Sequence, residues 1–526
     1  MTLSYPSREL WPQRVYALPE LQYTDSLNAC YELLDKHIEA GRGNAVAIYF
    51  QQSTITYDEL FHEVTRLSAV LREEGIQAGD RVILRLLNRP HFISTWLALL
   101  RIGAVAVATP PPIKARELHA IVSSAQPAML ISEPELWDEV AKLNDPTRTA
   151  DVNELRKRSE TAIPMTHCAA TSNDTLAIVA YTSGSTGVPK GCMHSHADLL
   201  ATTDSFARYV LKPTAADRFG GHPTMAFVYG LGGLLLFPLR FGASTVLLDR
   251  FTPAALAETI EKYKVSIAFC APTSLRMMMN DCPDLKRRVA SLRYAISAGE
   301  TLPASVYTAW TEKTGIEVLD AIGSTEMLHV FISGMPGRTR PGATGEVVPG
   351  YEARVVDELT MKTVPDGTPG LLAVRGPTGC RYFNLNERQQ QYVREGWNLP
   401  GDIYIRDADG YFSYQCRNDD LIICGGINIS GPEIEGVLLE HPAVGEVAVV
   451  ASPDDIRGMV PKAFIVLRTG FDPCDELKAD LQKKVQSELA SYKSPRKLEF
   501  VSELPKTSTG KIRRTELRQR EFSMAR

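Results

Sequence analysis

The sequence has no long hydrophobic run and no excess of basic charge, and each absence excludes a class of protein. Its most apolar stretch, residues 231–239, is interrupted by Gly232, Gly233 and Pro238 and is too short to span a membrane. Lys and Arg total 57 against 62 for Asp and Glu, a formal net charge of -5, which argues against a general nucleic-acid binder. The N-terminal "MTLSYPSRELWPQ" lacks the basic and apolar regions of a secretory signal. We therefore expect neither a membrane nor a nucleic acid as partner.

The cysteines are few and unclustered. There are nine, an odd number, and no two form a CxxC pair. Such a set is typical of reduced thiols and not of a disulfide framework or a zinc site. We expect a cytoplasmic protein.

Three common motifs of nucleotide and nucleophile chemistry are also missing. The Gly-rich segment "YTSGSTGVPKG" (181–191) has the wrong spacing for a Walker A loop, because Lys190 stands three residues after Gly187. No G-x-G-x-x-G fingerprint is present, and no serine of the segment lies in G-x-S-x-G. His194 and His196 in the following "CMHSH" have no third ligand cluster, so we expect them to be solvated or to cap an ordinary helix that begins there.

The Gly-rich segment nevertheless suits an anion. It follows the apolar run 176–180, so its hydroxyls and backbone N–H groups would project from a strand end, where they can bind phosphate oxygens. A polar connecting turn explains the segment equally well when it is considered alone.

Apolar segments alternate with helical ones along most of the chain. Thr56 with Glu59 forms a capping box that predicts a helix start. This alternation predicts an α/β fold with largely parallel sheets. The predicted strands are 45–50, 80–87, 104–109, 244–249, 265–270, 293–299 and 316–323.

The pattern changes twice toward the C-terminus. A Gly- and Pro-rich stretch, 333–350, leads to shorter strands, and a second change comes at 416–435. A small α+β segment follows, with a helix at 432–439, strands at 447–452 and 462–468, and a charged helix from about 476. We place a boundary at Asp419, which gives domains 1–418 and 419–526.

Four short motifs carry further candidate chemistry. In "GSTEM" (323–327), Glu326 follows a predicted strand and could hold Mg²⁺ beside bound phosphates. Asp402 in "GD" and Arg417 in "RNDD" could bind ribose hydroxyls, and "PKTSTGK" presents Lys511 in a Gly-containing loop. Each motif taken singly is also typical of a solvated turn.

Together and in this order, YTSGSTGVPKG, GSTEM, GD, RNDD and PKTSTGK resemble the adenylate-forming superfamily of acyl-CoA synthetases, luciferases and adenylation domains. The resemblance covers almost the whole chain. It implies an α/β fold with a large N-terminal domain of stacked mixed sheets and helices, a β-barrel-like subdomain within it, and a small mobile α+β C-terminal domain.

The resemblance also implies a reaction. A carboxylate attacks the α-phosphate of MgATP to give an acyl-adenylate and pyrophosphate, and then a thiol, usually that of CoA, displaces AMP. Lys511, Thr325, Glu326 and Lys190 would be catalytic, with Glu326 holding Mg²⁺. The residues implied for ATP are Thr182, Ser183, Gly184, Ser185, Thr186, Gly187, Ala298, Gly299, Glu300, Asp320, Ala321, Ile322, Gly323, Ser324, Asp402 and Arg417.

The second step requires rearrangement, because CoA must enter where Lys511 stood. By resemblance the C-terminal domain swings about Asp419, and Gly425 and Gly426 approach the pantetheine arm.

The acid pocket resembles that of aryl-CoA ligases of the benzoate and 2-aminobenzoate (anthranilate) group, through "FVYGLGG" and "GSTEMLHVFIS". The match to 2-aminobenzoate ligases is the longer one. The residues implied for the acid are Phe227, Val228, Tyr229, Gly230, Gly299, Gly323 and His329.

The leading interpretation is an ATP-dependent aryl-CoA ligase for 2-aminobenzoate, with the aromatic acid, ATP and CoA as small-molecule partners. Benzoate as substrate, or aryl loading onto the phosphopantetheine of a carrier protein, stays open, and a downstream acyltransferase or carrier protein is a further candidate partner. A non-catalytic nucleotide-binding protein is disfavoured by the presence of both Lys511 and Glu326. A phosphoryl-transfer NTPase would release ADP instead of AMP.

Overall fold

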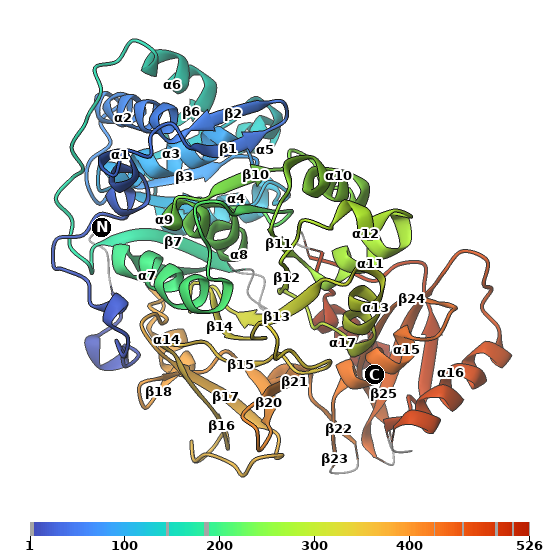
Figure 1. Ribbon diagram of the computed structural model, residues 1–526. Helices are drawn as coiled ribbons and strands as arrows, with labels where there is room; N and C mark the ends of the chain where they lie inside the picture. Colours follow the sequence, from blue (N-terminus) through green and yellow to red (C-terminus); the bar gives the residue numbers. More distant parts are fainter. Residues whose placement is uncertain are drawn as a thin grey trace.

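A computed structural model describes residues 5–143, 147–182, 189–424, 427–454, 457–489, 493–507 and 510–524. The first two-thirds of the chain builds two large sheets with helices around them, and a third sheet lies below them in Figure 1. The orange and red C-terminal part forms a separate lobe at the lower right of Figure 1. This arrangement is the predicted α/β fold with a large N-terminal domain and a small C-terminal domain.

One of the two large sheets ends in the Gly-rich segment. Its strands run in the order β6-β5-β3-β4-β7-β8, all parallel except β8, which pairs antiparallel with β7. The strands are β3 (Arg81–Arg85), β4 (Val105–Ala108), β5 (Met129–Ser132), β6 (Thr149–Asp151), β7 (Leu176–Thr182) and β8 (Lys190–Ser195).

The other large sheet has nine strands among the described residues, in the order β15-β14-β13-β12-β11-β9-β10-β1-β2. Its central strands are parallel, so their carboxyl ends share one edge, where ligands bind in α/β proteins. The strands are β1 (Val46–Phe50), β2 (Ser53–Thr56), β9 (Arg218–Gly221), β10 (Ser244–Leu247), β11 (Ile267–Cys270), β12 (Tyr294–Ser297), β13 (Glu317–Gly323), β14 (Val330–Ser333) and β15 (Glu346–Val347).

A buried helix, α3 (Pro90–Arg101), belongs to the main hydrophobic core, which takes side chains from both sheets. All but its first residue are buried, including the polar side chains of His91, Ser94, Thr95 and Arg101. The other helices of this part are α1 (Lys36–Glu39), α2 (Tyr57–Glu73), α4 (Ala115–Ala125), α5 (Trp137–Ala141), α6 (Val152–Ser159), α7 (His196–Thr202), α8 (Val228–Leu231), α9 (Phe237–Phe241), α10 (Pro253–Tyr263), α11 (Pro272–Asp281), α12 (Leu285–Arg288) and α13 (Ala304–Thr314).

The predicted β-barrel-like part is a six-stranded antiparallel sheet, and the C-terminal lobe has its own smaller sheets. The six strands are β16 (Glu352–Val356), β17 (Gly370–Arg375), β18 (Val393–Arg394), β19 (Trp397–Asn398), β20 (Asp402–Arg406) and β21 (Phe412–Arg417), with α14 (Asn386–Tyr392) beside them. The lobe holds β22 (Ile422–Cys424), β23 (Ile427–Ile429), β24 (Val444–Asp454), β25 (Gly458–Leu467), β26 (Lys497–Phe500), α15 (Gly431–Leu439), α16 (Asp475–Glu488) and α17 (Arg514–Met524).

Most sequence predictions of local structure are confirmed. The predicted strands coincide with β1, β3, β4 and β10 to β13, and Thr56 and Glu59 form the capping box of α2. The prediction for "CMHSH" is confirmed in one respect and wrong in another. A helix does begin in this string, since α7 starts at His196 with Ser195 as its N-cap, but His194 lies within β8 and both rings are buried instead of solvated.

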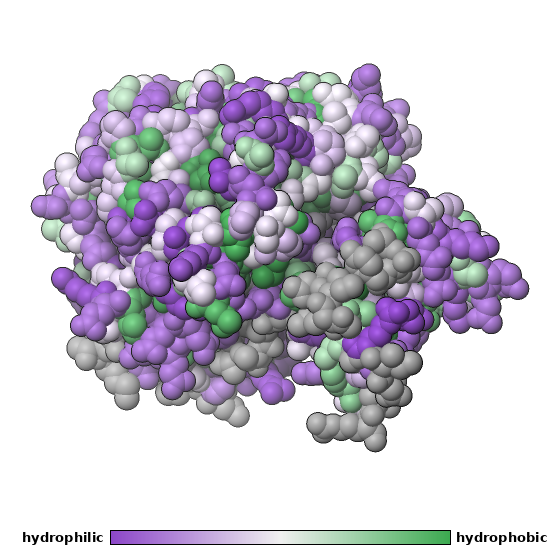
Figure 2. Space-filling view, turned by 90° about the horizontal axis from the view of Figure 1, so that it is seen from below, coloured by the Kyte–Doolittle hydropathy of each residue, from purple (hydrophilic) through white to green (hydrophobic). Residues whose placement is uncertain are grey.

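The described part of the chain contains no helix long and apolar enough to cross a membrane. On the face in Figure 2, hydrophilic residues predominate and hydrophobic ones form small patches. All nine cysteines are free thiols, as predicted.

Candidate active site

The stem of the Gly-rich loop is a closed hairpin. Thr182 at the end of β7 pairs with Lys190 at the start of β8. The backbone thus places Lys190 at the base of the loop. The predicted phosphate ligands Ser183, Gly184, Ser185, Thr186 and Gly187 lie outside the described residues.

The GSTEM motif is a tight turn between β13 and β14. The Met327 N–H donates to the Ser324 carbonyl and the Leu328 N–H to the Thr325 carbonyl, at 3.2 and 3.1 Å. Leu328 has φ of 68°, a left-handed conformation that is unfavourable for a bulky side chain. Thr325 and Glu326 therefore stand at the tip of a strained turn beyond a strand end.

Glu326 is held by a tyrosine that the motifs did not indicate. The Tyr382 hydroxyl donates to Oε1 of Glu326 at 2.7 Å. Burial first, and then the negative charge of Glu326, raises the pKa of Tyr382 far above its ordinary value, so the phenol keeps its proton for this bond. Glu326 is half-buried. Mg²⁺ usually retains several water ligands and takes only one or two carboxylates from the protein. A single half-buried carboxylate such as Glu326 is therefore a suitable ligand for it.

The predicted adenine-binding segments lie side by side. Ser297 at the end of β12 pairs with Asp320 on β13, which brings 298–300 next to 320–322 at the carboxyl edge of the sheet. Asp320 Oδ1 is buried and has no hydrogen-bond partner among the described residues, and burial raises the pKa of this carboxyl well above its usual range. The structure thus brings Ala298, Gly299, Glu300, Asp320, Ala321 and Ile322 together at one edge.

Two glycines of the site differ in what surrounds them. Gly299 has φ of 90°, and a Cβ there would have no atom within 4 Å, so it borders open space. A Cβ at Gly323 would collide with the His329 carbonyl across the β13–β14 pair. The open space at Gly299 can admit a ligand, whereas Gly323 is required by the packing of the turn itself.

Asp402 and Arg417 are directly paired residues of β20 and β21. The Arg417 Nη1 and Asp402 Oδ1 atoms are 2.9 Å apart. The charge of Asp402 raises the pKa of Arg417, and burial raises that of Asp402 although Arg417 opposes the change. Sheet register explains why two residues 15 apart in the sequence form one polar unit.

Lys511 reaches this unit from the C-terminal lobe. Surrounding protein lowers its pKa, and the charges of Glu300, Arg417, Asp402 and Glu326 act on it. Lys511 still remains exposed to solvent. The structure therefore gathers one lysine, one arginine and three carboxylates from distant motifs around an accessible site.

The residues expected to line the acid pocket begin with Phe227, which immediately precedes α8. The Tyr229 hydroxyl lies 3.1 Å from the Cys270 carbonyl and 3.0 Å from the Ile296 carbonyl, which fixes its ring against β11 and β12. Val228 and Phe227 are half-buried beside it. These side chains can present an apolar wall near the open carboxyl edge of the sheet.

The glycines of α8 and of the π-helix η6 (Gly232–Leu236) do not leave free room for a ligand. A Cβ at Gly230 would collide with the Thr224 carbonyl, and one at Gly232 with the His329 ring. His329 packs edge-on to Phe237, with ring centroids 4.6 Å apart. The space is filled by the protein, so the slot depends on side chains and not on bare backbone at these two positions.

Two predictions concern the link to the C-terminal lobe. Asp419 lies in a single 3-10 turn, Asn418–Asp420, between β21 of the third sheet and β22. The hinge and the domain boundary there stay predictions. Gly425 and Gly426 lie outside the described residues, although the flanking Cys424 and Ile427 are paired as in a hairpin.

Comparison with known proteins identifies the family. The family model described as "AMP-binding enzyme" matches residues 34–382, and that of the "AMP-binding enzyme C-terminal domain" matches 433–511. The chain belongs to the AMP-binding enzyme family. It is an AMP-forming acid–thiol ligase, as the motifs predicted.

Three relatives of this family member are informative. A benzoate–CoA ligase of Thauera aromatica is 35% identical, over 95% of this chain and 97% of its own. The anthranilate CoA ligase AuaEII, solved in complex with anthranoyl-AMP, is 32% identical with a TM-score of 0.91, over 97% of this chain and 100% of that one. A benzoate CoA ligase from Burkholderia xenovorans LB400 is 32% identical with a TM-score of 0.86, over 94% and 100%.

Proposed function

We propose that this AMP-binding enzyme is an aryl-CoA ligase that activates 2-aminobenzoate with ATP and transfers the acyl group to CoA. The observation that carries the proposal is the gathering of Lys511 with Glu326, Asp402 and Arg417 around one accessible site. Similarity to benzoate and anthranilate CoA ligases over nearly the full chain supports an aromatic acid as substrate.

In the first step an oxygen of the carboxylate bonds to the α-phosphorus, and the bond to the β-phosphate oxygen breaks to release pyrophosphate. Two anions must approach each other, so the site has to supply fixed positive charge and hydrogen-bond donors. Lys511 would supply the charge and Thr325 a hydroxyl. The Asp402–Arg417 pair would bind the ribose, and the loop above Lys190 would hold the departing phosphates.

Glu326 is the residue that would hold Mg²⁺. When bound, the ion neutralises phosphate charge. The chain's own contribution is the Tyr382 hydroxyl, which fixes the rotamer of Glu326 and leaves its other oxygen for the ligand.

In the second step the thiol sulfur bonds to the acyl carbon, the thiol proton is lost, and AMP leaves. Lys511 would stand at the approach to the α-phosphate during the first step, so we propose that CoA enters after the C-terminal domain turns about Asp419. Gly425 and Gly426 would then face the pantetheine arm.

His329 is our candidate for the acceptor of the ortho-amino group. Its Nε2 lies 3.4 Å from the Tyr229 carbonyl, so the proton belongs on Nε2 and Nδ1 carries a lone pair. Nδ1 has no partner among the described residues. Burial lowers the pKa of His329 to about 3, which keeps the ring neutral at pH 7. An acceptor left unpaired would disfavour benzoate.

Benzoate is the second candidate substrate, because a benzoate–CoA ligase shares 35% of its residues with this chain. The deciding experiment incubates the protein with ATP, Mg²⁺ and a panel of benzoates, with and without CoA, and identifies the products by mass. We expect AMP, pyrophosphate and 2-aminobenzoyl-CoA. ADP, or no acid-dependent pyrophosphate, would contradict a ligase; a higher kcat/KM for benzoate would overturn the substrate assignment alone. Transfer to a carrier-protein phosphopantetheine in place of CoA would change only the acceptor.

A further inference from the structure

His194, in the middle of β8, makes a contact that reaches the GSTEM turn. Its Nε2 lies 2.7 Å from the Thr325 carbonyl oxygen, and its side chain is fully buried. A carbonyl oxygen can only accept, so Nε2 carries the proton and donates. The ring thus holds the backbone of the residue expected at the α-phosphate.

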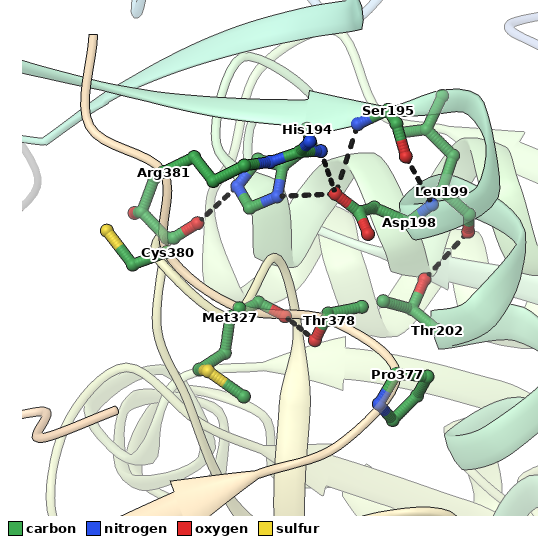
Figure 3. A network of polar contacts seen from close by, with 12 residues as sticks. His194, Ser195, Asp198, Leu199, Thr202, Met327, Pro377, Thr378, Cys380 and Arg381 are labelled. Atoms are coloured by element: carbon green, nitrogen blue, oxygen red, sulfur yellow. Dashed lines mark hydrogen bonds and ion pairs between the residues drawn. The ribbon is translucent and has the colours of Figure 1, made fainter. Parts of the chain in front are cut away.

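The opposite side of the ring faces a buried carboxylate. His194 Nδ1 is 3.7 Å from Asp198 Oδ2, and Figure 3 shows Arg381 reaching the same carboxylate. Arg14 is 2.8 Å from Asp198 Oδ1. Burial alone would raise the pKa of Asp198, but Arg14, His194 and Arg381 hold it well below its usual range. Nδ1 has no hydrogen-bond partner among the described residues, so the hydrogen bond that orients the ring is the one from Nε2 to the Thr325 carbonyl.

The same carboxylate is tied to backbone. Oδ2 of Asp198 accepts from the Ser195 N–H at 3.1 Å, and the Ser195 hydroxyl accepts from the Asp198 N–H at 3.3 Å, a capping box that starts α7. Side-chain rotation of Asp198 is thus restricted by its own helix start.

The turn itself needs outside support. Leu328, with φ of 68°, is in a conformation that costs energy and persists only where neighbouring contacts enforce it. The Thr378 hydroxyl donates to the Met327 carbonyl at 2.8 Å, in addition to the His194 contact on Thr325. Thr325 and Met327 of the turn are thus tethered from two other segments.

His194 also shares a strand with the base of the phosphate loop. Lys190 and His194 are four residues apart on β8, so their side chains leave the same face, about 13 Å apart at strand rise. The strand therefore joins the loop expected at the β- and γ-phosphates to the turn expected at the α-phosphate and Mg²⁺.

We propose that His194 is a positioning residue for adenylate formation, whose Nε2–H fixes the Thr325–Glu326 turn relative to the phosphate loop at Lys190. The proposal rests on the proposed roles of that loop and that turn, but not on which acid is activated. Loss of the contact should let the turn relax and should impair the transition state more than the binding of ATP.

Two substitutions of His194 distinguish the role of Nε2 from that of Nδ1. In His194→Gln the amide nitrogen can stand where Nε2 stands and can still donate to Thr325; in His194→Asn it reaches only the position of Nδ1. We expect His194→Asn to lower kcat of acid-dependent ATP–pyrophosphate exchange by about ten- to a hundredfold with KM for ATP changed less than about threefold. We expect His194→Gln to recover most of kcat.

Ser195→Ala is the matched control, because it weakens the start of α7 without touching Thr325. It should lower the thermal midpoint and leave kcat unchanged. Three outcomes would each overturn the proposal. The kcat of His194→Asn could equal that of wild type, the Asn and Gln variants could lose kcat equally, or Ser195→Ala could lose as much kcat as His194→Asn.

Hydrogen–deuterium exchange over residues 324–329 gives a readout that needs no substrate. We expect faster exchange in His194→Asn than in His194→Gln, and unchanged exchange would overturn the proposal. If wild type shows no aryl-dependent exchange of pyrophosphate, the proposed substrate class fails, while the hydrogen-exchange comparison still decides the role of His194 in holding the turn.

Discussion

The Tyr382 hydroxyl donates a 2.7 Å hydrogen bond to Oε1 of Glu326, from a position 56 residues farther along the chain. Tyr382 itself is fully buried, and its backbone N–H donates to the Gln389 side chain at 2.8 Å. A rigid phenol thus sets the direction of the carboxylate that we propose for Mg²⁺.

Tyr382→Phe should therefore weaken the response to Mg²⁺. The variant loses one oxygen and retains the ring, so Glu326 gains rotational freedom; supporting bonds of this kind are worth about 10–100-fold in metal affinity or activity. We expect a Mg²⁺ titration of pyrophosphate release to show half-saturation at a concentration at least tenfold higher. Tyr57→Phe, which removes the bond from Tyr57 to the Ala243 carbonyl, should leave that titration unchanged. An unaltered titration in Tyr382→Phe would remove Tyr382 from the proposed site.

The sequence predicted the parts of the fold that hydrophobic periodicity and caps determine. Strands β10 to β13 are short apolar runs between helices, and the capping box of α2 is a local interaction. Asp402 and Arg417 could be grouped only through the family resemblance, and the register of β20 with β21 explains their pairing.

Other parts of the site depend on contacts that no local pattern reveals. Asp198 and Arg381 are 183 residues apart, and Tyr382 meets Glu326 only because the segment after β17 crosses the turn. The sequence predicted a solvated or capping role for His194, because no third metal ligand accompanies the His pair. In the folded chain β8 is covered on both sides, so the ring is buried and its Nε2 bonds to the Thr325 carbonyl.

Removing the charge of Arg417 from the Asp402–Arg417 pair should weaken ATP binding. Arg417→Met should leave the Asp402 carboxylate, 5% exposed, without its counterion, and its already raised pKa should rise further. We expect KM for ATP to increase by about tenfold or more, with a smaller change in KM for the acid. Arg417→Lys retains the charge but not the paired donors, so an intermediate KM is expected. Equal KM values for ATP in Met, Lys and wild-type proteins would contradict ribose binding by this pair.

Asp198→Asn tests the buried charge cluster through stability. Removing one partner of a buried ion pair costs about 3–5 kcal/mol, so the thermal midpoint at pH 7 should fall. The folded pKa of Asp198 lies below its ordinary 3.8, so its contribution is complete above about pH 4 and is lost as the pH falls below that value. The difference between variant and wild type should therefore shrink below pH 4. Asp174→Asn removes an exposed partner of the same Arg381 and should cost less than about 1 kcal/mol.

Substitution of Lys511 should slow the two half-reactions to different extents. Lys511→Ala should slow adenylate formation by about 10² or more, the scale of removing one preorganised stabilising group. Conversion of a supplied acyl-adenylate to the thioester should be much less impaired, because Lys511 is expected to have left the site by then. Measuring both steps in single-turnover reactions checks this, and equal loss in both would contradict the hinge at Asp419.

The pH dependence of the first step provides an independent check on the same residue. The surrounding protein lowers the pKa of Lys511 below its ordinary 10.5, so the ammonium loses its proton at a lower pH than a free lysine does. Adenylate formation by wild type should therefore decline as the pH rises toward that lowered pKa, since the neutral amine no longer offsets the charge between carboxylate and phosphate. The residual activity of Lys511→Ala should lack this decline, because the titrating group is gone. A decline of the same size in Lys511→Ala would assign the alkaline limb to another group and remove Lys511 from the charge balance of the first step.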